Sequence, residues 1–128
     1  MTFDLTLGFH QKPAALGETL SALGFTFQRV VPKDDIFGVT MEYYEFFDPN
    51  RSRSGVYLIY HDGTYPDHQV SWERIVDDAN SIVATASITA SMRRNAFDEE
   101  KQLTTGRFLR DYYQAVLYDP QAGKLISE

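Results

Sequence analysis

The sequence predicts a single α+β domain in which a mixed, mainly antiparallel sheet packs against two helices on one of its faces. The first observation is a period-2 pattern over residues 82–92, where Ile, Ala and Met alternate with Val, Thr and Ser, as in a strand with one buried face. The second is a long amphipathic pattern that starts near Asp98 and is followed by an apolar segment at 115–118. Strand, helix and strand in this order indicate a split β-α-β unit.

The first third of the chain follows a similar order. Phe and Leu alternate with other residues over 2–9, which predicts a strand. Pro13 stands where the first helical residue is expected, and three leucines then recur four and three residues apart before Gly24. Proline at the start and glycine just past the end are typical of a helix, here over 13–23. A second strand is expected over 25–31.

The middle of the chain predicts a β-hairpin. Residues 36–47 are rich in β-branched and aromatic side chains, 48–55 are rich in turn residues, and 56–61 form the return strand. Residues 68–79 fit both a helix and a short strand, because apolar residues recur at helical spacing around a short alternating segment.

The last helix is expected to begin with Asp98 as its N-cap, because Glu99 and Glu100 then occupy the first turn, where the helix dipole favours acidic side chains. A short edge strand is expected over 124–126. Each predicted helix carries a glycine followed three residues later by leucine. This correspondence suggests that the two halves repeat a βαββ plan.

Composition limits the classes of protein to which the chain can belong. Its 128 residues are 43% hydrophobic, enough to form the core of one domain over 1–128. The absence of cysteine excludes disulfides, thiolate metal sites and a thiol nucleophile. The net charge of −6 disfavours binding to a phosphate backbone, so nucleic acid is not an expected partner.

The expected location is cytoplasmic. The first residues show neither a basic region nor a continuous apolar run, so we expect no signal peptide. The sequence contains no stretch of about 20 apolar residues, the length that a membrane helix needs. A chain without cysteine also fits a reducing compartment.

Aromatic residues on the predicted hairpin give the leading hypothesis for function. Tyrosine combines an apolar ring with a polar hydroxyl and is enriched at binding surfaces. If helices cover only the other side of the sheet, the hairpin exposes an aromatic face; if both sides are covered, the same residues are core. We therefore predict a non-catalytic module that binds a protein or a small ligand through this face. The predicted binding residues are Glu42, Tyr44, Phe46, Arg51, Arg53, Tyr57 and Tyr60.

Two alternatives remain open. Histidines and aspartates at 61–68 could ligate a divalent metal, which would make the chain a small metal-dependent hydrolase centred on His61, Asp62 and His68. The same residues also suit the end of a strand and the turns after it. Because no ligand spacing matches a known motif, we expect no cofactor. The third hypothesis is a structural homodimer joined through sheet edges or faces.

The segment LRDYYQAVLYDPQAG, residues 109–123, resembles the helix–strand–YDPQxG ending of small microbial α/β domains of uncharacterised and immunity type. The resemblance is confined to this part of the chain. It implies a non-enzymatic binding protein and assigns a role to none of the residues. The residues themselves predict the end of a helix, a buried strand and a turn.

Overall fold

The computed structural model describes residues 2–33, 38–47, 54–63, 72–77, 81–91 and 95–128. Within them the chain forms β1 (Thr2–Phe9), α1 (Leu16–Ala22), β2 (Phe25–Val31), β3 (Met41–Phe47), β4 (Ser54–His61), the 3₁₀-helix η1 (Trp72–Arg74), β5 (Ala84–Ser91), α2 (Ala96–Tyr113), β6 (Val116–Asp119) and β7 (Lys124–Leu125). None of the helices in these residues has the length and apolar character needed to cross a membrane.

All seven of these strands belong to one sheet in the order β2-β3-β4-β5-β1-β6-β7, and each neighbouring pair is antiparallel. This confirms the predicted α+β fold class. Strand β1 lies between β5 and β6, so β5, α2 and β6 form the predicted split β-α-β unit. Strands β1 and β2, joined through α1, have three strands between them. The duplicated βαββ plan stays a prediction.

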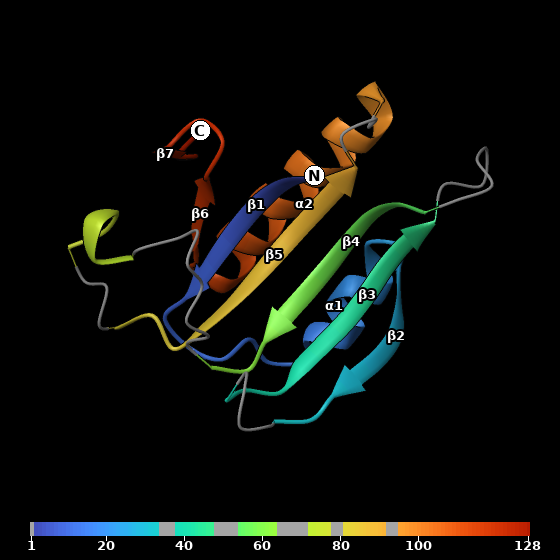
Figure 1. The fold of residues 1–128 in the computed structure, drawn as a ribbon, viewed down its shortest axis with the longest axis horizontal. Helices are drawn as coiled ribbons and strands as arrows, with labels where there is room; N and C mark the ends of the chain where they lie inside the picture. The colour runs from blue at the N-terminus through green and yellow to red at the C-terminus, as the bar shows by residue number, and fades with distance from the viewer. Residues whose placement is uncertain (1, 34–37, 48–53, 64–71, 78–80, 92–94) are drawn as a thin grey trace.

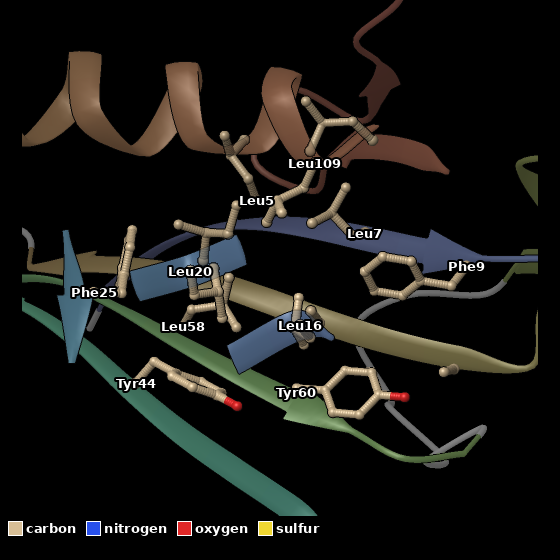
Figure 2. Close-up of a cluster of buried hydrophobic side chains, with 14 of the residues drawn as sticks. Leu5, Leu7, Phe9, Leu16, Leu20, Phe25, Tyr44, Leu58, Tyr60 and Leu109 are labelled. Atoms are coloured by element: carbon tan, nitrogen blue, oxygen red, sulfur yellow. The ribbon is translucent and has the colours of Figure 1, made fainter. Parts of the chain in front are cut away.

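Both α-helices lie on the same side of the sheet. Figure 1 views the molecule from the other side, with α1 behind the β3–β4 region and α2 behind β1 and β5. The side chains that face the helices form the core, which Figure 2 shows in close-up. Along β1, β4 and β5 they are Leu5, Leu7, Phe9, Val56, Leu58, Tyr60, Ala84, Ala86, Ile88 and Ala90. They alternate with the residues of the opposite face, as the period-2 patterns predict.

The start of α2 differs from the prediction. Asn95, and not Asp98, is the N-cap: its side chain accepts a hydrogen bond from the backbone N–H of Asp98 at 2.8 Å. The Asp98 carboxylate accepts in return from the backbone N–H of Asn95 at 3.4 Å. This reciprocal capping box satisfies two N–H groups at once and starts the helix earlier than the acidic residues alone suggest.

A buried amide ties α2 to the centre of the sheet. Gln102 is 1% exposed, and its Nε2 donates to the carbonyl oxygens of Phe3 at 2.9 Å and Ile88 at 2.7 Å. The two acceptors belong to β1 and β5, which are paired strands. Because a buried polar group without partners is costly, these bonds fix the position of the helix along the sheet.

Other elements depart from the predicted bounds. Strand β3 begins at Met41 rather than at residue 36; residues 34–37 lie outside the described part of the chain. Within 68–79, residues 72–74 form η1, and residues 68–71 and 78–79 are not described. The Trp72 ring lies against Gly8, where an added Cβ would come within 2.9 Å of it.

We expect Asn95→Ala to lower the free energy of unfolding by about 1 kcal/mol, because it removes the side-chain acceptor of the capping box. Asn95→Asp keeps an acceptor and is expected to stay near wild type. Urea unfolding followed by circular dichroism measures both values. A loss in Asn95→Asp as large as that in Asn95→Ala would contradict the assignment of the stabilisation to the side-chain acceptor.

Candidate functional site

The β3–β4 hairpin carries most of the predicted binding residues, and its register divides them between two faces. Glu42 pairs with Tyr60 and Phe46 with Val56, and these side chains point toward the helices. Tyr57 pairs with Glu45, and both point to the opposite side. The predicted set therefore does not form one continuous surface.

Tyr44 and Tyr60 belong to the core rather than to an exposed aromatic patch. They are 4% and 5% exposed, respectively. Figure 2 shows their rings near Leu16 and Leu20 of α1, with the hydroxyls directed toward the same end of the hairpin. The expectation that these two rings supply contact area to a partner is thus corrected, because α1 covers this part of the sheet.

The hydroxyls of these two tyrosines are held by carboxylates that lie two residues away along the chain. Tyr44 donates to Glu42 Oε1 at 2.5 Å, and Tyr60 donates to Asp62 Oδ1 at 3.1 Å. Lys12 Nζ lies 3.2 Å from the same Asp62 oxygen. Burial, followed by the adjacent carboxylates, raises the pKa of both tyrosines well above the ordinary value. Glu42, predicted as a polar anchor, is thus an acceptor within the fold.

The opposite side of the sheet presents a second set of residues, which we call the outer face. It consists of Tyr43, Glu45, Tyr57, Ile59, His61, Ser87 and Thr89. Tyr57 is 42% exposed, and its neighbours across the strands are Glu45 and Thr89. The guanidinium of Arg29 lies 4.5 Å from the centre of the Tyr43 ring and extends the outer face to β2. Sequence reasoning named Tyr57 but missed Arg29 and Tyr43 as contributors.

Phe46 occupies a third position, at the end of the hairpin near the start of α2. Its ring lies 5.7 Å from that of Phe25 and 6.0 Å from that of Phe97, between ring centres. The Lys101 ammonium is 4.3 Å from the centre of the Phe46 ring. Phe97 and Lys101 were not predicted as site residues, although their spacing of four on a helix places them side by side.

The residues of the metal hypothesis are not brought together where they are described. His61 is on the outer face, with Nδ1 3.5 Å from Thr85 Oγ1, whereas Asp62 points to the helix side and contacts Lys12 and Tyr60. His68, like Arg51 and Arg53, lies outside the described residues. Within the described ranges, no three His, Asp or Glu side chains are grouped so that they could hold a metal ion.

Comparisons with known protein families, with curated proteins and with solved structures found no match to this chain. The resemblance of residues 109–123 to immunity-type domains therefore stays a prediction, as does the homodimer.

The buried tyrosines predict a loss of stability at alkaline pH. Above the ordinary tyrosine pKa of 10.0, unfolded tyrosines lose their protons while folded Tyr44 and Tyr60 keep theirs. The unfolded state then binds fewer protons, so the free energy of unfolding falls as pH rises, by up to about 1.4 kcal/mol per pH unit for each group. Below that pKa the contribution is fully present.

Urea unfolding between about pH 9 and 11.5 measures this slope. Tyr44→Phe is expected to flatten it, because phenylalanine has no proton to lose. Tyr112→Phe is the matched control, since Tyr112 is 61% exposed, and it is expected to keep the wild-type slope. A slope that is the same in all three proteins would contradict the assignment.

Proposed function

We propose that this chain is a non-catalytic recognition module that binds a protein partner through the outer face of its sheet. The observation that carries the proposal is the exposure of Tyr57, 42%, in the middle of a strand where its two neighbours, Val56 and Leu58, are fully buried. A large aromatic ring that stays accessible on a sheet surface supplies contact area at low entropic cost, because only two torsion angles must be fixed.

The composition of the outer face supports protein recognition. Its side chains are mainly tyrosines and hydroxyl residues, the types that predominate in adaptable binding surfaces. Arg29, stacked on Tyr43, adds a side chain of the kind that is enriched at interfaces. Side chains of these types bind a partner by stacking and packing against it.

The shape of the outer face favours a protein over a small molecule. Small ligands prefer concave pockets that bury most of their surface. Two pockets lined by described residues lie against α2, one beside Phe46 and one beside residues 10–14, and neither of these includes a residue of the outer face. The exposed ring of Tyr57 is instead suited to packing against the surface of a protein.

Charge indicates the kind of partner. The chain carries −6, and Glu45 is the direct cross-strand neighbour of Tyr57. A partner with a basic contact surface would be attracted at long range and would meet a carboxylate beside the central ring. Association is therefore expected to slow as salt is added, because the Debye length shortens to about 8 Å at physiological ionic strength.

The test is affinity capture from the native cytosol with three immobilised proteins: wild type, Tyr57→Ala and Tyr112→Ala. Tyr112 lies on α2 and is 61% exposed, so its substitution removes the same side chain from the other side of the molecule. We expect wild type and Tyr112→Ala to capture the same protein partner in stoichiometric amount. Tyr57→Ala is expected to capture at least about tenfold less of it, as after removal of a binding hot spot. Loss with Tyr112→Ala but not with Tyr57→Ala would contradict the proposal.

A further inference from the structure

A pocket of about 270 Å³ lies on the helix side of the molecule, at the first half of α2. Its lining residues are Phe46, Phe97, Glu100, Lys101 and Thr104. Phe97, Lys101 and Thr104 are four and three residues apart, so they share one side of the helix. Phe46 contributes to the lining from β3. The pocket is separate from the outer face and independent of its function.

The Lys101 ammonium is the cationic group of this pocket. It donates one hydrogen bond to the carbonyl oxygen of Leu23, where α1 ends, and lies against the Phe46 ring. An ammonium has three donors, so two are left for a ligand. In the part of the chain that the structure describes, ion pairs join Lys12, Arg107 and Arg110 to carboxylates, and none involves Lys101. Burial lowers the pKa of Lys101, because removal from water disfavours its charged form.

A second pocket gives the contrast. It has a volume of about 340 Å³, lies at the other end of α2 beside Tyr112 and Tyr113, and also contains a lysine, Lys12. The Lys12 ammonium is already paired with Asp62 at 3.2 Å. The charge of that pocket is matched by the protein itself, whereas the charge at Lys101 is available to an anion.

We propose that the pocket around Lys101 binds a small aromatic monocarboxylate, with the carboxylate on the ammonium and the ring against Phe46 and Phe97. The two phenylalanine rings are inclined by 31° with centres 6.0 Å apart, so they form one apolar wall on which a flat ring can pack. The volume is slightly below the roughly 300 Å³ at which pockets for drug-sized ligands begin, which limits the ligand to a single ring system.

Glu100 narrows the choice of anion. This acidic residue lines the same pocket as Lys101. Among the residues that line this pocket Lys101 is the one cation, so the second negative charge of a dianion such as phosphate would find no cationic partner there and would face Glu100. An aromatic carboxylate therefore fits the pocket better than a phosphorylated ligand.

Phenylacetate is a suitable probe, with phenylacetamide as its neutral analogue of the same shape. Amide chemical shifts of the folded protein report where each compound binds. We expect phenylacetate to shift the signals of Phe97, Lys101 and Thr104 saturably, with a Kd of about 1 mM. Phenylacetamide is expected to bind at least about tenfold more weakly, because it lacks the charge.

Substitutions in each pocket show whether phenylacetate binds at Lys101 or elsewhere on the protein. Lys101→Met is expected to weaken phenylacetate binding at least about tenfold, whereas Lys12→Met, in the second pocket, leaves it unchanged. Because Lys101→Met also removes the bond to Leu23, Phe97→Ala serves as a second variant; that side chain is 46% exposed, and its loss is expected to weaken acid and amide alike.

Three results would overturn the proposal: equal affinities for phenylacetate and phenylacetamide, unchanged affinity in folded Lys101→Met, or no saturable shift at the pocket up to about 20 mM ligand. None of them bears on the capture experiment, so the two proposals fail independently.

Discussion

The pairing of β1 with β5 is the constraint on which the rest of the structure depends. Eight consecutive residue pairs join these strands, from Thr2 with Ser91 to Phe9 with Ala84. They place the first strand of the chain in the interior of the sheet, where β6 then adds to its other side. Strand β5 also pairs with β4 and so positions the β3–β4 hairpin, whose two faces contribute to the two candidate sites. Gln102 bonds to both central strands and so sets α2 relative to them.

Small residues on these elements allow the helices to approach. Three alanines of β5 face the helix side and are at most 1% exposed: Ala84, Ala86 and Ala90. Larger side chains from β1 and β4 fill the space above them, among them Phe9 and Tyr60, whose rings meet nearly edge to face. Gly106 has the same role on α2, because a Cβ there would lie 3.0 Å from Leu117. The small residues therefore determine how close α2 lies to the sheet.

Sequence patterns predicted β1 and β5 well because each alternates over eight residues, a length that chance rarely produces. They did not determine which face of the hairpin is covered, because aromatic residues occur on both: Tyr44 and Tyr60 on one, Tyr43 and Tyr57 on the other. That choice depends on where α1 packs, a contact between segments distant in sequence. The Lys101 pocket was missed for a related reason. The spacing of Phe97 and Lys101 is visible in the sequence, but their wall, Phe46, comes from β3.

The interior position of β1 also affects how the chain is made. Ribosomes add about 5–20 residues per second, so the N-terminal strand emerges several seconds before β5 can pair with it, and β6 emerges later still. During that interval Leu5, Leu7 and Phe9, fully or almost fully buried in the finished protein, have no sheet to join. The nascent chain therefore presents an unpaired hydrophobic strand, the kind of segment that holding chaperones bind, until most of its length has been synthesised.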